Sequence, residues 1–320
     1  MSARDITAIG SQARAPRPRL EAVSPRWGER LIVALLALCA IVSVATTLAI
    51  VVSLLVPTIG FFGEVPFVDF LFGTDWAPTF ADASFGVLPI VVGTLTVTAW
   101  ALLVAIPVGL LTAIYLAEYA PTRVRRTIKP VLEILEGMPT VAIGLFALYF
   151  VRPLLEDAFP FLPWGGPFSV GVAGVAVGLM IVPLVSSVSD DAMRSVPAGL
   201  REGAYALGAT KMKVAARVVF PAAISGIVAA VVLAASRAIG ETMVVLIAAG
   251  ATPQLLAPWE FTDSIQTMTA FIGTTATGDI ATGTITYDTI FAVGALLFVM
   301  TLLMNMFAIR LVRRFREVYE

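Results

Sequence analysis

Six long runs of apolar residues constrain the fold of this chain more than any other feature of its sequence. They cover residues 31–56, 87–116, 138–151, 170–188, 221–249 and 285–309. A helix needs about 20 mostly apolar residues to cross the hydrocarbon core of a bilayer, and most of the runs are long enough. Backbone groups in lipid must be hydrogen-bonded within their own segment, and the runs lack the alternation of barrel strands. The sequence therefore predicts an all-α polytopic membrane protein with six transmembrane helices.

The third run is the shortest, and its helix must begin inside the segment PVLEILEGMPT at 130–140. Two carboxylates of this segment, Glu133 and Glu136, would then lie near a membrane face, where they could pair with the basic residues of 123–129. Only 13% of all residues are charged, against roughly 25% in soluble domains. We expect one membrane domain over 28–320, preceded by a disordered cytoplasmic arm over about 1–27.

The positions of the lysines and arginines predict the orientation of the spans. Nineteen of the 21 basic residues lie in the N-terminal arm, the C-terminal tail and the loops 117–130 and 189–220. We expect these segments, and therefore both termini, in the cytoplasm. Three segments with nine acidic residues and a single basic one are expected outside: 57–86, 152–169 and 250–284. The one basic residue that no loop accommodates is Arg237.

Arg237 and Glu241 place two full charges inside the fifth apolar run, in the stretch SRAIGETMVV at 236–245. At 1.5 Å per residue, Arg237 lies roughly 24 Å from Pro221, past the bilayer midplane, and residues four apart share a helical face. An ion that faces lipid would cost on the order of 2.5–3.5 kcal/mol, so both charges should face a protein or water-lined interior. They could form a structural ion pair, although such pairs seldom repay their desolvation. They could instead line an anion path, because a guanidinium offers a planar fork that matches phosphate oxygens.

The loop 189–220 is rich in helix formers and in charges of both signs, unlike a flexible linker. Apolar residues recur at roughly helical spacing after Pro197: Leu200, Ala204, Leu207 and Met212. This pattern predicts a short amphipathic helix, a turn at Gly208 and a second helical stretch that leads to Pro221. Such a helix could lie on the lipid headgroups, or its apolar face could dock in a groove of a cytoplasmic partner.

The same loop resembles the EAA loop of ABC importer permeases, which is written EAA, three residues, G, nine residues, I-x-L-P. The matching positions are Glu202 to Ala204, Gly208 and Val218 to Pro221, with glycine, valine and phenylalanine replacing one alanine, the isoleucine and the leucine. The resemblance implies that residues 198–221 dock on an ATPase subunit as a coupling helix. The residues expected to serve this coupling are Arg201, Glu202, Gly203, Ala204, Leu207, Gly208 and Pro221.

Further stretches resemble the permeases of the Pst phosphate system, and among them the PstC-type subunit. They are FLFGTDWAP at 70–78, AIYLAEYAP at 113–121, LEGMPTVAIG at 135–144 and SRAIGETMV at 236–244. The resemblance covers about residues 30–310 and implies the type I ABC importer permease fold in a bacterial cytoplasmic membrane. It also implies three kinds of partner: a homologous PstA-like permease, two PstB-like ATPases and an extracytoplasmic PstS-like phosphate-binding protein.

The chain itself is expected to be a transport subunit and not an enzyme. A Walker A loop has the pattern G-x-x-x-x-G-K-[ST], and the segment that begins at Gly203 has Ala209 where the lysine belongs. We therefore expect this chain to bind no cofactor or metal, and a partner ATPase to use ATP and Mg. No nucleic-acid partner is expected.

The function expected from these features is ATP-driven import of inorganic phosphate. In this hypothesis Arg237 meets the anion, while Glu241 neutralises the arginine in the empty state and limits how tightly phosphate binds. An ABC importer for sulfate, molybdate or phosphonate is the alternative. A secondary anion transporter is a further one, although an EAA-type loop has no role in that class.

Overall fold

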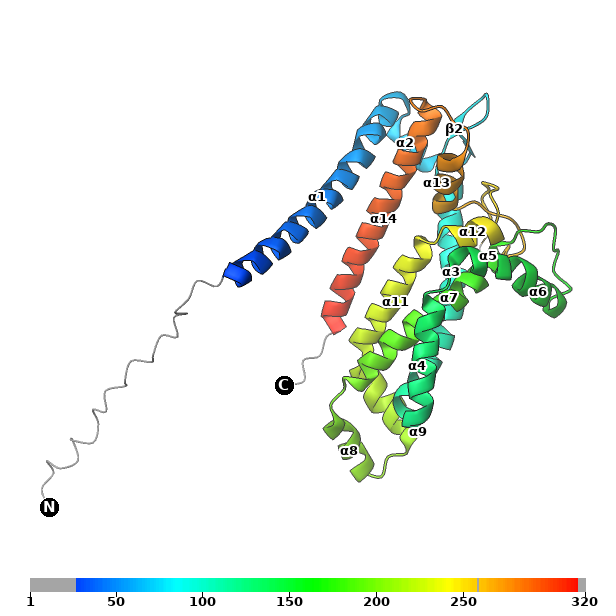
Figure 1. Ribbon diagram of the computed structural model, residues 1–320. Helices are drawn as coiled ribbons and strands as arrows, with labels where there is room; N and C mark the ends of the chain where they lie inside the picture. Colours follow the sequence, from blue (N-terminus) through cyan, green and yellow to red (C-terminus); the bar gives the residue numbers. More distant parts are fainter. Residues whose placement is uncertain (1–26, 258, 316–320) are drawn as a thin grey trace, which may run out of the picture. The chain divides into compact units, whose positions relative to one another are not determined.

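The computed structural model describes residues 27–257 and 259–315. The N-terminal arm expected over about 1–27 thus lies outside the described residues, except for Trp27, which begins helix α1 (Trp27–Glu64). The chain divides into two compact units, Met1–Val52 and Ser53–Glu320. In the first unit the described residues form the N-terminal part of α1. The second unit holds the rest of α1 and all other described helices and strands (Figure 1).

Helices make up nearly all the regular structure of the second unit, with one antiparallel pair of strands, β1 (Trp76–Ala77) and β2 (Ser84–Phe85). The helices before residue 160 are α2 (Phe67–Phe72), α3 (Leu88–Ile114), η1 (Tyr115–Tyr119), α4 (Thr122–Glu136), α5 (Thr140–Phe146), η2 (Ala147–Val151) and α6 (Arg152–Ala158). Those after it are α7 (Val170–Arg194), α8 (Ala198–Ala206), α9 (Lys211–Val214), η3 (Ala215–Val219), α10 (Phe220–Ala222), α11 (Ile224–Ile239), α12 (Met243–Ala248), α13 (Met268–Thr277) and α14 (Ile285–Phe315).

Four helices in the described part of the chain are long and apolar enough to cross a membrane: Trp27–Glu64, Leu88–Tyr119, Val170–Arg194 and Ile285–Arg310. Two bent pairs complete a set of six if each pair counts as one span. These are Thr122–Glu136 with Thr140–Ala158, bent by 95°, and Lys211–Ala222 with Ile224–Ile239, bent by 71°. The predicted all-α polytopic class is confirmed, but the fifth run is divided into several helices instead of one.

Helices α3 and α7 form the centre of the second unit because small residues let their backbones approach closely. A Cβ at Gly178 would lie 2.7 Å from the carbonyl oxygen of Ala101, and a Cβ at Gly109 would lie 2.7 Å from the Cβ of Val185. In lipid, where no hydrophobic force drives helices together, such close packing is a main source of association. Helix α11 packs against both helices, so the central pair fixes the position of the broken fifth span.

Three turns are π-helical: η1 ends the helix that begins with α3, and η2 and η3 each join two helical segments. In η1 the backbone N–H of Ala120 donates to the carbonyl of Tyr115, five residues earlier, at 2.7 Å. The same five-residue bond links Arg152 to Ala147 and Phe220 to Ala215. Single π turns of this kind are often found at functional sites, and here η1 pairs with α8 through Glu118 and Arg201, while η3 packs against α8.

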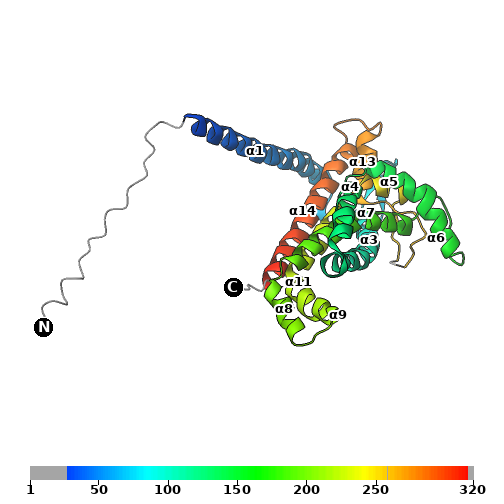
Figure 2. The same cartoon turned by 60° about the horizontal axis from the view of Figure 1, so that its bottom comes forward.

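The two ends of the second unit carry different structures. Figure 1 shows α8 and α9 at one end and α2, β2 and α13 at the opposite end, and Figure 2 shows α13 apart from α8 and α9 from another direction. The distribution of basic residues predicts that α8 and α9 are cytoplasmic. The short helix α13 lies inside the segment 250–284, which was expected to be an outer loop, and it packs against α14 and α3.

Candidate transport pathway and coupling site

The two broken spans approach each other near the points where their helices are interrupted. Helix α4 ends at Glu136, and α5 begins at Thr140 after Pro139. In the other span α11 ends at Ile239 and α12 begins at Met243. Helices α5 and α12 pack against each other. Non-helical backbone at membrane depth is tolerated where it is buried in protein or lines a water-filled cavity, so this region is a candidate for the transport pathway.

Arg237 connects the two interruptions. Its Nη1 lies 3.6 Å from Oε1 of Glu136, and its Nη2 donates to the backbone carbonyl of Glu136 at 3.4 Å. The two side chains are 35% and 33% exposed. The guanidinium thus lies near the carbonyl ends of α4 and α11, where the helix dipoles favour a positive charge. Both distances are long for direct contacts, so another acceptor could replace Glu136 at small cost.

Glu241 does not share a helical face with Arg237, in contrast to the prediction from their spacing. The reason is that α11 ends at Ile239 and Gly240 follows as its C-terminal cap, so the four-residue spacing no longer describes one helix. Among the described residues, the carboxylate paired with Arg237 is Glu136, which comes from the other broken span. The expected neutralisation of Arg237 by Glu241 is therefore supplied by Glu136.

Glu241 instead holds the start of α12. Its Oε1 accepts a hydrogen bond from the backbone N–H of Val244 at 3.1 Å, and its carbonyl accepts one from the Thr269 hydroxyl at 2.7 Å. The residue is only 9% exposed. A carboxylate at a helix N-terminus pairs with an otherwise unsatisfied N–H and suits the positive end of the helix dipole. Glu241 thus fixes α12 and ties it to α13.

The EAA-like segment has the local structure that its sequence predicts. Helix α8 follows Pro197, and the turn after it contains Gly208 with a φ of 76°, a conformation that glycine adopts at no steric cost. The second helical stretch comprises α9, η3 and α10, and Pro221 lies within α10 just before the 71° bend. The residues expected to serve coupling therefore occupy a helix, a turn and the base of the fifth span.

Several apolar side chains are exposed on α8, on the turn after it and at the start of α9. Leu207 is 90% exposed, Met212 73% and Tyr205 43%, while Glu202 is exposed and a Cβ at Gly203 would meet nothing within 4 Å. An exposed apolar group of this kind at the end of a helix typically marks an interaction site.

Ala204 does not belong to this exposed surface. It is half-buried against a core cluster that includes Met193, Val214 and Ile227. The sequence pattern placed Ala204 and Leu207 on one apolar face, and the structure separates them because α8 ends at Ala206, so the chain turns away at Leu207.

Arg201 fastens α8 to the helical bundle. Its Nε and Nη2 both donate to Oε1 of Glu118 at 3.2 Å. Nη1 donates to the carbonyl of Val196 and Nη2 to that of Met193, each at 2.7 Å. Glu118 is 5% exposed and Arg201 20%. One guanidinium thus links α8, η1 and the C-terminal end of α7, which makes Arg201 a structural connection rather than an exposed contact residue.

The acidic partners of Arg125 and Lys129 in α4 were not identified from the sequence. Asp190 and Asp191 were assigned to the loop 189–220, but α7 continues to Arg194 and Asp190 is fully buried. Arg125 and Lys129 pair with these aspartates, and not with Glu133 and Glu136, which the sequence had left open as partners. The buried aspartate could have been suspected from the sequence SVSDDAM, which continues the helical spacing of the apolar run before it.

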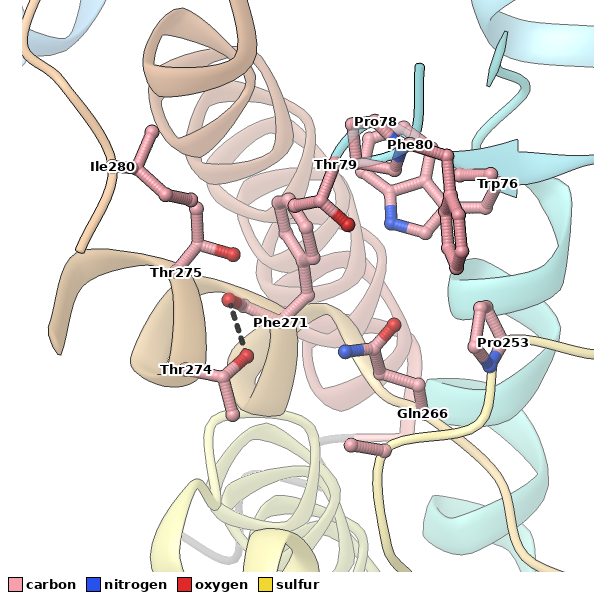
Figure 3. Close-up of a pocket in the computed structure, with 12 residues that line it drawn as sticks. Trp76, Pro78, Thr79, Phe80, Pro253, Gln266, Phe271, Thr274, Thr275 and Ile280 are labelled. Atoms are coloured by element: carbon pink, nitrogen blue, oxygen red, sulfur yellow. Dashed lines mark hydrogen bonds between the residues drawn. The ribbon is translucent and has the colours of Figure 1, made fainter. Parts of the chain in front are cut away.

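A small pocket lies at the opposite end of the unit, where the segment FGTDWAP forms part of its wall (Figure 3). Its volume is about 230 Å³, and all the residues that line it are uncharged. Trp76 is 2% exposed and packs edge-on against Phe271, with ring centroids 4.8 Å apart. Figure 3 shows the Gln266 amide directed toward these two rings. This pocket offers hydrogen-bonding groups but no charge that would attract an anion.

The broken-helix bundle, with a projecting helix and turn at one end, defines a multi-span membrane permease. Residues 105–317 match the family described as the binding-protein-dependent transport system inner membrane component, and the chain belongs to this family. The family consists of permease subunits of ABC transporters, so the chain is a membrane-embedded permease and not itself an enzyme.

Two relatives cover most of the chain. The probable ABC transporter permease protein YqgH of Bacillus subtilis is 35% identical over 268 residues, which are 83% of this chain and 84% of that protein. The phosphate transport system permease protein PstC 1 of Mycobacterium tuberculosis is 34% identical over 249 residues, 72% of this chain and 73% of that protein.

Solved structures agree on the fold. An inward-facing form of the MetNI methionine ABC transporter matches with a TM-score of 0.52 and 20% identity, over 72% of this chain and 94% of that one. A bacterial ABC transporter for the acidic polysaccharide alginate matches with a TM-score of 0.53 and 16% identity, over 87% of this chain and 100% of that one. The predicted type I ABC importer permease fold is thereby confirmed.

Proposed function

We propose that this chain is the PstC-type permease subunit of an ATP-driven importer of inorganic phosphate. It forms half of the translocation pathway and couples to a cytoplasmic ATPase through residues 198–221. The observation that carries the proposal is the partly exposed guanidinium of Arg237 between two broken spans. A relative named as a phosphate transport permease supports the choice of substrate.

In the proposed mechanism phosphate meets Arg237 by replacing the carboxylate of Glu136. The arginine remains charged in any surroundings, and its planar fork suits two phosphate oxygens. Its contacts with Glu136 are long, so exchange of one anion for the other costs little and phosphate can leave again. Glu241 supports this site indirectly, because it holds the first turn of α12 beside the interruption.

The proposed partners follow from the two ends of the molecule. The exposed Leu207 and Met212 beside α8 provide an apolar surface for one of two PstB-like ATPases, which would use ATP and Mg while this chain binds no cofactor. A homologous PstA-like permease would complete the pathway. An extracytoplasmic PstS-like phosphate-binding protein would meet the acidic loops at the other end, in a bacterial cytoplasmic membrane with both termini of this chain inside.

The role of Arg237 is tested by phosphate uptake into vesicles that contain the assembled transporter. Arg237→Gln should lower uptake roughly 10-fold or more, because a hydrogen bond to a charged group contributes about 1.5–3 kcal/mol. Arg237→Lys should recover little, since an ammonium lacks the planar fork. Arg152→Gln is the matched control, because Arg152 also pairs with a single glutamate, Glu156. Wild-type uptake by either Arg237 variant at normal expression would show that this residue does not handle the substrate.

The choice of anion is tested separately by ATPase stimulation in the same assembly. Phosphate with its binding protein should raise ATP hydrolysis, whereas sulfate, molybdate and phosphonate should not. Stimulation by sulfate but not by phosphate would assign the chain to the other oxyanion importers. Uptake that continues without ATP, from a protein that purifies without an ATPase subunit, would assign it to the secondary transporters instead.

A further inference from the structure

A cavity of about 480 Å³ lies between the N-terminal half of α4 and the C-terminal end of α7. Its lining includes four basic residues, Arg125, Arg126, Lys129 and Arg194, and one acidic residue, Glu133. The cavity is well above the roughly 30 Å³ that one water occupies in the liquid. It belongs to the end of the unit that carries α8, which the distribution of basic residues predicts to be cytoplasmic (Figure 1).

Two of the basic residues give the cavity a fixed shape. Arg125 Nη2 lies 2.6 Å from Oδ2 of the fully buried Asp190, and Lys129 Nζ lies 2.6 Å from Oδ1 of Asp191. Residues four apart share one face of a helix, so both α4 cations point toward α7. These pairs join α4 to α7 and hold one wall of the cavity in place.

The other two basic residues remain available to a ligand. Within the part of the chain that the structure describes, Arg126 and Arg194 form no salt bridge, and both are exposed. They approach the cavity from different helices, α4 and α7. Two guanidinium groups from different helices can each offer a pair of N–H donors to the oxygens of one anion.

An unsatisfied donor also lies beside the cavity. The Nε of Arg125 is buried and has no hydrogen-bond partner. Buried polar atoms are nearly always paired in native proteins, so each exception calls for an explanation such as an absent ligand or water. Basic residues that only set membrane orientation would need neither a cavity nor such buried groups.

We propose that this cavity binds a phosphate group, held by Arg126 and Arg194 and positioned by the ion pairs of Arg125 and Lys129. The group belongs either to the headgroup of an anionic phospholipid in the adjacent leaflet or to inorganic phosphate in the cytoplasm. Basic pockets between helices at the cytoplasmic face are suited to lipid headgroups. The four basic residues outnumber the three carboxylates Glu133, Asp190 and Asp191, so the surroundings of the cavity carry a net positive charge that attracts either ligand.

Occupation of the site has a structural consequence for the pathway. The ligand would link α4 to α7 a second time, and α4 is the helix that ends at Glu136, the partner of Arg237. A bound phosphate group would therefore stabilise one position of the broken third span. This inference does not rest on the identity of the transported anion, because the cavity and the Arg237 site are composed of different residues.

The experiment uses the full chain in nanodiscs and compares two probes. In the first arm, phosphatidylglycerol competes with phosphatidylcholine, and native mass spectrometry measures the retained lipid. In the second arm, inorganic phosphate is titrated into phosphatidylcholine nanodiscs, and the midpoint temperature of unfolding of the chain is measured. Chloride at equal ionic strength is the reference. Selective retention of phosphatidylglycerol supports the lipid source, and stabilisation by phosphate supports the free anion.

The variants assign the binding to the cavity. Arg126→Gln with Arg194→Gln should weaken binding at least about 10-fold, whereas the paired lysine substitutions at these positions should keep part of it. The charge-matched control is Arg123→Gln with Lys213→Gln, two exposed basic residues of the same end that do not line the cavity. In the lipid arm Arg237→Gln should retain phosphatidylglycerol like the wild type, and in the phosphate arm the cavity variants are compared in an Arg237→Gln background, which separates this site from the proposed pathway. Absence of binding in both arms, or equal losses in the double glutamine variant and its control, overturns the proposal.

Discussion

Removal of the Arg201 side chain should detach α8 from the bundle without unfolding the rest of the chain. Arg201→Ala deletes four hydrogen bonds and leaves the 5%-exposed Glu118 without its cation. Breaking a buried pair by removing one partner costs about 3–5 kcal/mol. Arg201 is 20% exposed and its bonds to Glu118 are 3.2 Å long, so water can replace part of the loss and we expect roughly 2–3 kcal/mol.

Amide hydrogen exchange of α8 measures this loss directly, because exchange of a protected helix reports the free energy of local opening. At 1.4 kcal/mol per tenfold change, the α8 amides should exchange roughly 30–150-fold faster in Arg201→Ala, while those of α3 keep the wild-type rate. Glu118→Gln should have a smaller effect, and the double variant should cost less than the sum of the single ones, because the partners interact. An unchanged exchange rate of α8 in Arg201→Ala would refute the assignment of Arg201 as its main attachment.

Two further predictions concern glycine positions and the start of α12. Gly73→Ala should lower the free energy of unfolding by about 1–3 kcal/mol, because its Cβ would lie 2.5 Å from the Cα of Gly86. Gly203→Ala should be tolerated, because a Cβ there would meet nothing within 4 Å. Equal effects of the two substitutions in thermal unfolding would contradict this prediction. Glu241→Ala should lower the free energy of unfolding by about 0.5–2 kcal/mol, as for the loss of a helix cap. Glu241→Gln should lower it less, because the amide oxygen can still accept a hydrogen bond from the backbone N–H of Val244. A larger loss in Glu241→Gln than in Glu241→Ala, measured by thermal unfolding, would show that the charge of Glu241 matters and not its capping.

The unbroken long helices could be predicted from the sequence because their cause is local. A membrane span needs a long apolar run, and the runs at 87–116, 170–188 and 285–309 correspond to α3, α7 and α14. The turn after α8 could also be predicted, because Gly208 stands between two stretches of helix formers, and it adopts a positive φ. In these places the composition of a short window determines the backbone.

The interruption after Arg237 could not be predicted in the same way. Gly240 lies within an apolar run, and glycine is common inside membrane helices. Tertiary contacts end α11 there, because Glu241 is held by Thr269 from α13 and by the first turn of α12. The partner of Arg237 comes from 101 positions earlier in the chain, so no spacing rule connects them. A charge pair between two spans becomes visible only when the spans are placed together.

The π-helical turn η3 gives the stretch Ala215–Val219 a tolerance of length that a regular helix lacks. A π turn contains one residue more than the α-helical turn that would replace it. Deletion of one residue within Ala215–Val219 should therefore restore a regular helical turn and leave α8 in nearly the same orientation relative to α11. The same deletion within α11 has no extra residue to absorb it, so it would rotate α8 by about 100° relative to Arg237, with a shift of about 1.5 Å. We therefore expect η3 to hold a spare residue, whose loss leaves unchanged the direction in which the exposed Leu207 faces.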